Sequence, residues 1–326
     1  MIIDVHHHWV PREFVDNVEK YLRPNERAVW KDGVATIFRD NVEVCTRNPK
    51  HCDIEAQIRD MDAAQVDMAV LTTAVWQGWN NMKMAPFIND SMAEIMAKYP
   101  HRFLALAHVP PFEEGAVEEL ERAIKVLGLK GVCITTHFDG KYPGDDAYRP
   151  LYKKIAELDV PIFVHAASAM VGHEFLSQDE VTHKMVRTFG RAIDHCLVVI
   201  RLLGSDILKD FPTLKFINGH IGGVWAYMST RLLKPFRRDW NTDEAPSEGL
   251  DRLYFDLAPS GWQQPQITCA TALLGADHLL FGSDFPSADP KALEVNQKFV
   301  TGLDIPAQDK EKIFSGNAIR LFKLKV

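Results

Sequence analysis

Short apolar runs recur along the whole chain, and most are followed by a longer segment with a helical pattern of apolar positions. Most of the short runs are continuously apolar, which is typical of strands buried on both faces of a parallel sheet. The pattern predicts strands at Ile2–Val5, Met68–Thr73, Phe103–His108, Gly131–Thr135, Pro161–His165, Leu214–Gly219, Leu253–Asp256 and Leu279–Gly282. It predicts helices at Lys83–Tyr99, Glu113–Leu127, Tyr148–Leu158, Thr188–Asp210, Gly223–Phe236, Gln263–Leu274 and Asp309–Phe322.

This alternation of strands and helices predicts the fold class. Repeated strand–helix units without a break in composition favour an α/β chain that forms one (β/α)8 TIM barrel across residues 1–326. A doubly wound open sheet is the alternative, but no GxGxxG sequence follows the first strand. Residues 10–60 interrupt the alternation as a long segment after the first strand, and we expect them to cap the barrel mouth.

Composition excludes several classes of partner. Hydrophobic residues make up 46% and charged residues 25% of the chain, as in ordinary globular proteins. The formal net charge of −7 gives no basic stripe for nucleic acid, and no apolar run is long enough to suggest a membrane span. The 5 cysteines are scattered and form no CxxC pair, so we expect a reduced, cytoplasmic protein.

Ionisable side chains occupy the ends of several predicted strands, where the chemistry of a (β/α)8 barrel is found. The first strand continues into three histidines, and alternation sends His6 and His8 to one side and His7 to the other. The run continues an apolar strand, so it is not a purification tag. Further such residues follow the fifth, sixth and eighth strands, at His165, His220 and Asp284. Imidazole and carboxylate ligands with few cysteines nearby suit Zn²⁺, Mn²⁺ or Fe²⁺.

Several motifs together resemble one known superfamily. They are Asp-x-His-x-His on the first strand, single histidines after the fifth and sixth strands, and "GSDFP" after the eighth. This pattern resembles the amidohydrolase superfamily over nearly the whole chain. The segments "IRDMDAAQVDMAVLT", "YPHRFLALAHVP", "FPTLKFINGHIGG" and "IFSGNAIRLF" are most similar to its amidohydrolase-related family 2. That branch contains aminocarboxymuconate semialdehyde decarboxylase and γ-resorcylate decarboxylase.

The resemblance implies a site with one divalent metal ion, Zn²⁺ as the first expectation and Mn²⁺ as the alternative. The implied ligands are His6, His8, His165 and Asp284, and the implied acid–base residue beside the metal is His220. Many dinuclear amidohydrolases carry a carboxylated lysine at the end of the fourth strand. Here Lys130 precedes that strand and Thr136 and His137 follow it, which favours a mononuclear site.

The resemblance also implies two substrate-binding arginines and a homodimer. In aminocarboxymuconate semialdehyde decarboxylase, a cap arginine contacts a substrate carboxylate, and "KDGVATIFRD" aligns Arg39 with it, although the spacing to the following "MD" is longer here. The same family takes a second arginine from the neighbouring subunit, eleven residues after the histidine of the sixth strand. That offset from His220 is Arg231. The alternative for both is a solvated surface arginine.

A Lewis-acid metal beside a histidine supports two kinds of reaction. One is nonoxidative decarboxylation, in which His220 or Asp284 relays a proton to the carbon that loses CO₂. The other is attack by an activated water. The branch resemblance, the cap and the arginines favour decarboxylation of an aromatic or unsaturated, muconate-like carboxylic acid. A hydrolase or hydratase acting on a lactone, a C–C bond or an unsaturated dicarboxylate is the alternative. A binding protein on an inactive barrel is a third hypothesis, against which the intact ligand set argues.

Overall fold

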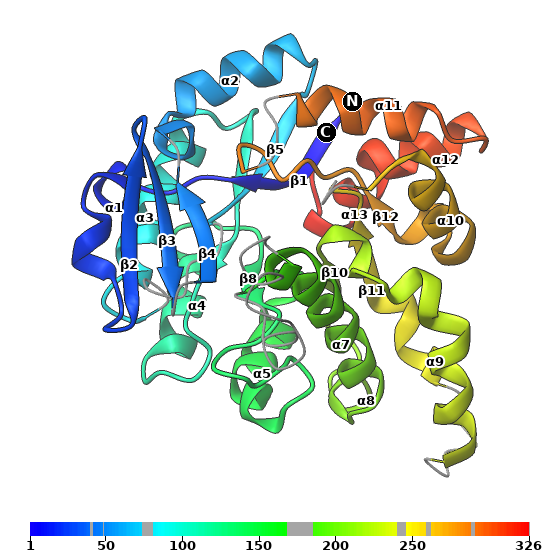
Figure 1. Cartoon of the computed structure of the whole chain (residues 1–326). Coiled ribbons are helices and arrows are strands. Elements are labelled where there is room, and N and C mark those ends of the chain that lie inside the picture. The colour runs from blue at the N-terminus through cyan, green and yellow to red at the C-terminus, as the bar shows by residue number, and fades with distance from the viewer. Residues whose placement is uncertain are drawn as a thin grey trace.

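A computed structural model describes residues 1–39, 42–47, 49–73, 81–167, 185–239, 246–258, 262–287 and 291–325. Its centre is a set of parallel strands (Figure 1). These are β1 (Ile3–His8), β5 (Met68–Thr72), β6 (Phe103–Ala105), β7 (Ala107–His108), β8 (Val132–Thr135), β9 (Ile162–His165), β10 (Phe216–Asn218), β11 (Leu253–Asp256) and β12 (Leu279–Leu280). They form two ladders, β1-β5-β6 and β12-β11-β10-β9-β8-β7. The prediction of an α/β chain with parallel strands is therefore confirmed.

Backbone hydrogen bonds connect the two ladders at both places where they meet. Leu106 separates β6 from β7, and its main-chain N–H donates to Leu71 O of β5 over 3.0 Å. Beyond β12, residues 281–285 run beside β1. The N–H of Val5 donates to Phe281 O over 2.9 Å, and the N–H of His8 donates to Phe285 O over 2.7 Å. The stretch that follows the last strand is thus anchored directly to the first.

The strands bury apolar side chains on two faces, and each face has its own cluster. The outer cluster lies between strands and helices. The inner cluster takes side chains from almost every parallel strand and from the last helix. Its members are Ile3, Val5, Val70, Leu104, Leu106, Cys133, Phe163, Ile217, Tyr254, Leu280, Ala318, Leu321 and Phe322. Full burial of one large apolar side chain contributes roughly 1.5–3 kcal/mol, so the inner cluster stabilises the strand arrangement substantially.

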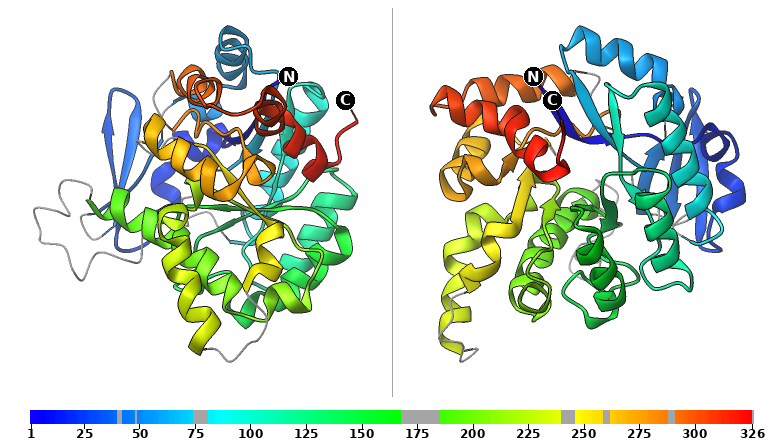
Figure 2. Two further views of the ribbon diagram at one scale, coloured as in Figure 1. Left: turned by 90° about the vertical axis from the view of Figure 1, so that its right-hand side faces the viewer. Right: turned by 180° about the vertical axis from the view of Figure 1, so that it is seen from behind.

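Helices surround the parallel strands (Figure 1, Figure 2). They are α3 (Ala85–Lys98), α4 (Ala116–Lys125), α5 (Arg149–Leu158), α7 (Arg191–Leu203), α8 (Ile207–Asp210), α9 (Trp225–Asp239), α10 (Gln264–Leu274), α11 (Ala292–Thr301), α12 (Ala307–Glu311) and α13 (Asn317–Phe322). On α4, Ala116, Leu120 and Ala123 are buried at intervals of three and four residues, which gives the helix one core-facing stripe. None of the helices within the described ranges has the length and apolar character needed to cross a membrane.

Residues 10–60 form small elements of their own beside the histidine end of β1 (Figure 1). These are α1 (Arg12–Asp16), an antiparallel sheet of β2 (Glu26–Lys31), β3 (Val34–Arg39) and β4 (Val42–Arg47), and the start of α2 (Ile54–Ala63). Asp32 and Gly33 join β2 to β3 with φ of 51° and 75°, the left-handed conformation that a tight hairpin requires. Gln57 Nε2 donates to His8 O over 3.0 Å, which fixes this segment to the end of β1.

Candidate metal centre and acid–base site

β1 carries a bulge that decides which way its histidines face. Asp4 is paired with Ala69 of β5, whereas His7 is paired with Leu71, so three steps along β1 match two along β5. The extra residue reverses the alternation of side chains after Val5. Without it, His7 would face inward with Val5, and the histidines on either side of His7 would face the helices.

The rings of these histidines lie accordingly on opposite faces. His6 packs with its ring centroid 5.0 Å from that of Phe163, a member of the inner cluster. His7 lies on the outer face, 5.1 Å from the ring of Phe285, and its Nδ1 is 2.9 Å from Asp4 Oδ2. The structure therefore separates His7 from its two neighbours, as alternation from His6 to His8 predicts.

Asp4 also fixes the loop that carries Asp284. Its carboxylate accepts hydrogen bonds from the Ser283 main-chain N–H over 3.0 Å and from Ser283 Oγ over 2.5 Å. The next residue, Asp284, has φ of 59°, which is uncommon for a non-glycine residue. Its N–H donates to His6 O over 2.8 Å. These contacts hold the Asp284 backbone in a conformation that costs about 1–2 kcal/mol.

Four side chains converge at the ends of β1 and β9 and in the loop after β12. One potential ligand atom from each lies within 4.8 Å of the others, in His6, His8, His165 and Asp284. Asp284 Oδ1 is 2.9 Å from His8 Nε2 and 3.6 Å from His6 Nε2. His165 Nε2 is 3.1 Å from His8 Nε2. The structure thus brings together the four residues that the sequence nominated as ligands.

The remaining ring nitrogens of these histidines face hydrogen-bond acceptors. His165 Nδ1 donates to Ala166 O over 2.9 Å. His8 Nδ1 lies 2.7 Å from Thr72 Oγ1, whose own hydroxyl donates to the carbonyl of His7 over 3.4 Å. His165 therefore carries its proton on Nδ1, and its Nε2 lone pair points into the site. With a metal ion bound, His8 would donate from Nδ1 to Thr72 Oγ1 and would leave its Nε2 lone pair for the ion.

Asp256, at the end of β11, plays the same part for His6. Its Oδ2 accepts from His6 Nδ1 over 2.8 Å, and both side chains are fully buried. His6 Nε2 is also buried, and among the described residues it has no hydrogen-bond partner. A buried ring nitrogen without a partner, converging with two others and a carboxylate, fits a divalent metal ion that takes the place of its proton. Asp256 was not among the predicted site residues, although it ends a predicted strand.

His220 lies beside this group on a short turn after β10. His220 and Ile221 have φ of 52° and 61°. The His220 N–H donates to Asp256 Oδ1 over 3.1 Å, so the carboxylate that orients His6 also holds this turn. The His220 ring centroid is 4.8 Å from that of His6 and 5.9 Å from that of His165. Its ring therefore faces the four-residue group from one side.

Burial and neighbouring charges give the histidines different pKa values. Burial disfavours the charged form of His6, but the carboxylates of Asp256, Asp284 and Asp4 outweigh it and raise the pKa of His6 to about 9. Burial, together with the adjacent His6, holds the pKa of His220 well below its usual range. Burial likewise lowers the pKa of His165. In the metal-free site His6 is therefore a charged imidazolium at neutral pH, whereas His165 and His220 are neutral imidazoles.

The two predicted substrate arginines, Arg39 and Arg231, are not part of the four-residue group. Arg39 is on β3, where its Nε and Nη2 donate to Glu26 Oε1 over 3.0 and 2.7 Å. Arg231 is exposed on α9, which extends outward from the other helices (Figure 1). Contact of either arginine with substrate stays a prediction.

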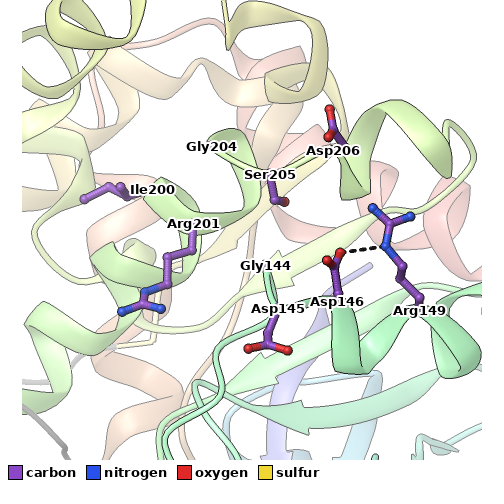
Figure 3. A pocket seen from close by; sticks show the side chains of 9 residues that line it. All are labelled: Gly144, Asp145, Asp146, Arg149, Ile200, Arg201, Gly204, Ser205 and Asp206. Atoms are coloured by element: carbon purple, nitrogen blue, oxygen red, sulfur yellow. Dashed lines mark hydrogen bonds and ion pairs between the residues drawn. The ribbon is translucent and has the colours of Figure 1, made fainter. Parts of the chain in front are cut away.

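A separate surface cavity of about 670 Å³ lies between the start of α5 and the end of α7 (Figure 3). Arg149 borders it and donates from Nε to Asp146 Oδ1 over 2.6 Å. Among the described residues that line this cavity there is none of the predicted site residues. This cavity is therefore distinct from the histidine group.

Comparisons with known proteins agree with the motifs. γ-Resorcylate decarboxylase of Rhizobium sp. (strain MTP-10005) is 28% identical over 83% of this chain and 87% of its own length. 2-Keto-4-carboxy-3-hexenedioate hydratase of Sphingobium sp. (strain NBRC 103272 / SYK-6) is 24% identical over 99% of this chain and 96% of its own. Among solved structures, 5-carboxyvanillate decarboxylase of Novosphingobium aromaticivorans, complexed with manganese and 4-hydroxy-3-methoxy-5-nitrobenzoic acid, superposes with a TM-score of 0.80. It is 21% identical and covers 99% of this chain and 96% of its own.

The family is shown by a sequence match that spans nearly the whole chain. The model described as "Amidohydrolase" matches residues 3–324. This span contains every motif on which the resemblance rests, from the first-strand histidines to the last helix. The resemblance drawn from the sequence is thereby confirmed, and the chain belongs to the amidohydrolase family.

Proposed function

We propose that the protein is a metal-dependent nonoxidative decarboxylase of an aromatic or unsaturated, muconate-like carboxylic acid. The observation that carries this proposal is the convergence of three histidine ring nitrogens and one carboxylate oxygen within 4.8 Å, beside a further histidine. The names of the relatives support the reaction: γ-resorcylate decarboxylase shares 28% of aligned residues with this chain. The substrate class follows from those names and from the two candidate arginines.

The proposed framework is a closed (β/α)8 barrel whose residues 10–60 cap the site. Support for closure comes from the backbone hydrogen bonds between β1 and residues 281–285. Support for the cap comes from its position beside the end of β1 and from His51, whose Nε2 is 3.0 Å from Ser287 Oγ in the loop after Asp284. A cap attached at these points would exclude water from a reacting carbanion.

One divalent ion would be held by His6, His8, His165 and Asp284. When bound, the ion supplies a Lewis acid that holds a substrate carboxylate or enolic oxygen and stabilises negative charge there. The nitrogen and carboxylate donors suit Zn²⁺, our first expectation, and Mn²⁺, which a solved relative contains. Metal analysis of protein purified without added metal distinguishes the two.

His220 and Asp284 are the proposed proton carriers. Loss of CO₂ leaves an electron pair on the substrate carbon, and a proton must reach that carbon. Because burial keeps His220 neutral, it first takes up a proton and then passes it on. Asp284 is suited to relay that proton because its side chain is 20% exposed, whereas those of His6 and His8 are fully buried.

The arginines would bind the substrate carboxylates in a homodimer. Arg39 belongs to the cap segment, and its pairing with Glu26 holds its guanidinium in place on β3. Arg231 is exposed on the outward-pointing α9, so it is free to approach the site of a partner subunit. Sedimentation of the purified protein tests the dimer, and an increase in KM for an Arg231→Ala variant with kcat retained tests its role.

The alternative function is that of a hydratase or hydrolase, because the 2-keto-4-carboxy-3-hexenedioate hydratase aligns over 99% of this chain. Metal-loaded protein incubated with a panel of aromatic and muconate-type acids decides between them. Release of CO₂ with a matching loss of product mass supports decarboxylation. A product heavier by one water supports the hydratase. A metal content near zero that added Zn²⁺ or Mn²⁺ does not restore would overturn both.

A further inference from the structure

A second buried histidine, His195 on α7, lies beside His220 and belongs to no part of the site described above. Its side chain is buried, and its Nδ1 is 2.6 Å from Oδ1 of Asn218, the last residue of β10. Asn218 Nδ2 donates in turn to the main-chain oxygen of His195 over 3.0 Å. Because this second bond fixes the amide, Asn218 Oδ1 must accept from His195, and the ring proton resides on Nδ1.

The other nitrogen of His195 is consequently a lone pair. His195 Nε2 is buried, and it has no hydrogen-bond partner within the described part of the chain. An unpartnered buried acceptor costs about 1–3 kcal/mol, so such a group calls for an explanation. Burial lowers the pKa of His195 to about 4, so the ring stays neutral and its lone pair stays available.

The His195 ring packs against the imidazole ring of His220. The two ring centroids are 5.4 Å apart, and the rings are nearly perpendicular at 79°. A hydrogen bond of about 2.9 Å between two imidazole nitrogens would place the centroids about 5 Å apart, so the two rings are near the separation that such a bond requires. Gly219 leaves room for the His195 ring beside the turn that carries His220. A Cβ at this position would lie only 3.3 Å from His195 Cε1 and 3.2 Å from Val164 O.

We propose that His195 is a positioning residue for His220. Its Nε2 accepts a hydrogen bond from one ring N–H of His220 and thereby turns the other ring nitrogen toward the metal centre. Asp256 fixes the backbone of His220, whereas His195 selects the tautomer and orientation of its ring. The proposal rests on the proposed function only in assigning His220 to proton transfer.

Two variants of His195 test this. His195→Leu removes the acceptor, and His195→Gln keeps an acceptor oxygen on a side chain of comparable reach. His278→Gln is the matched control, because His278 also donates from Nδ1 to a carbonyl, Leu253 O over 3.0 Å, but precedes β12 at the opposite strand end. All are compared with wild type as metal-loaded protein by ¹⁵N spectra of labelled histidine rings, metal content and steady-state kinetics.

In wild type we expect the His220 ring to show one protonated and one unprotonated nitrogen, and in His195→Leu averaged signals of both tautomers. With an acid that the wild type turns over, His195→Leu should lower kcat about 10- to 100-fold and leave KM and metal content unchanged. His195→Gln should recover part of this loss in kcat. Identical His220 nitrogen signals in wild type and in a folded His195→Leu variant would overturn the proposal; if that variant does not fold, averaged signals of both tautomers in His195→Gln would do so. If wild type turns over no acid, the proposed function fails, and the spectra still decide the role of His195.

Discussion

Replacing Asp256 with asparagine should change how strongly metal binding depends on pH. The carboxylate of Asp256 faces only donors, because Oδ2 accepts from His6 Nδ1 and Oδ1 accepts from the main-chain N–H groups of His220 and Ala258, over 3.1 and 2.9 Å. An amide has a single acceptor oxygen. In one orientation its NH₂ group would face His6, and in the other it would face both backbone N–H groups.

Two effects of this substitution oppose each other. In the wild type, the pKa of His6 is about 9, so at pH 7 only about one metal-free molecule in a hundred has His6 unprotonated. This proton competition weakens metal binding by about 3 kcal/mol. Asp256→Asn removes the strongest interaction that raises the His6 pKa. Burial should then lower the His6 pKa, so that protons no longer compete strongly with the metal ion at pH 7. The substitution also removes the acceptor that orients His6, and loss of such a partner weakens metal binding about 10- to 100-fold.

The difference in metal affinity between wild type and Asp256→Asn should therefore grow with pH. Wild-type affinity for Mn²⁺ should rise about tenfold per pH unit between pH 7 and 9, because one proton leaves as the ion binds. Asp256→Asn affinity should change little over this range, so the two proteins should bind almost equally at pH 7 and differ about 10- to 100-fold at pH 9. Competition with a chelator of known affinity measures both curves.

Asp194→Asn is the matched control for loss of a buried carboxylate. Asp194 is fully buried and accepts from Tyr142 Oη over 2.5 Å, and it is not part of the histidine group. This variant should keep the wild-type slope even where it lowers the free energy of unfolding. Parallel curves for wild type and Asp256→Asn would refute the assignment of the His6 proton to its pairing with Asp256.

Three further substitutions test other contacts. His220→Asn should keep its metal but lose about 100- to 10,000-fold in kcat, as measured with an acid that the wild type turns over; near-normal turnover would remove His220 from proton transfer. His7→Ala should retain near-stoichiometric metal by elemental analysis but lower the free energy of unfolding by about 2–4 kcal/mol, because it leaves a cavity and removes one hydrogen bond to the buried Asp4 carboxylate. Asn317→Leu should cost about 2–3 kcal/mol in urea denaturation, because Asn317 Nδ2 donates to Ala276 O and Leu279 O over 2.7 Å each. Equal stability of Asn317→Leu and wild type would mean that these carbonyls find other donors.

The parallel strands were largely predictable because most of them are runs of apolar residues, and Leu253–Asp256 has the predicted bounds. The antiparallel sheet of residues 26–47 was not predicted. Its first strand is mostly exposed and carries charged residues, so burial leaves no clear pattern there. The predicted helix Thr188–Asp210 is three elements, since a π-helical turn at Val186–Gly190 precedes α7, and Gly204 and Ser205 separate α7 from α8.

The site was predictable where a residue type alone carries the chemistry. Histidines and an aspartate at strand ends suggested a metal group before any geometry was known, and the structure brings those side chains together. Their hydrogen-bond partners were not predictable, because a threonine or carbonyl acceptor depends on which strands become neighbours. Asp256 illustrates this, since its role depends on pairing with His6, 250 positions away along the chain.

Two buried carboxylates hold the backbone at His220 and Asp284, which both have left-handed conformations. Asp256 accepts from a β1 histidine, His6, and from the main-chain N–H of His220. Asp4 likewise lies beside a β1 histidine, His7, and accepts from the loop that carries Asp284. Each carboxylate thus links the first strand to one of the proposed proton carriers, and strain at both carriers is held by charge-assisted hydrogen bonds.

This symmetry gives His7 a function that its position outside the metal group conceals. His7 cannot act as a ligand, because the bulge in β1 turns it to the outer face, where it packs on Phe285. From there it binds Asp4, the carboxylate that fixes Ser283 next to Asp284. In the proposed site all three consecutive histidines would serve one centre: two would supply ligands to the metal ion, and the middle one would secure the loop that supplies the carboxylate.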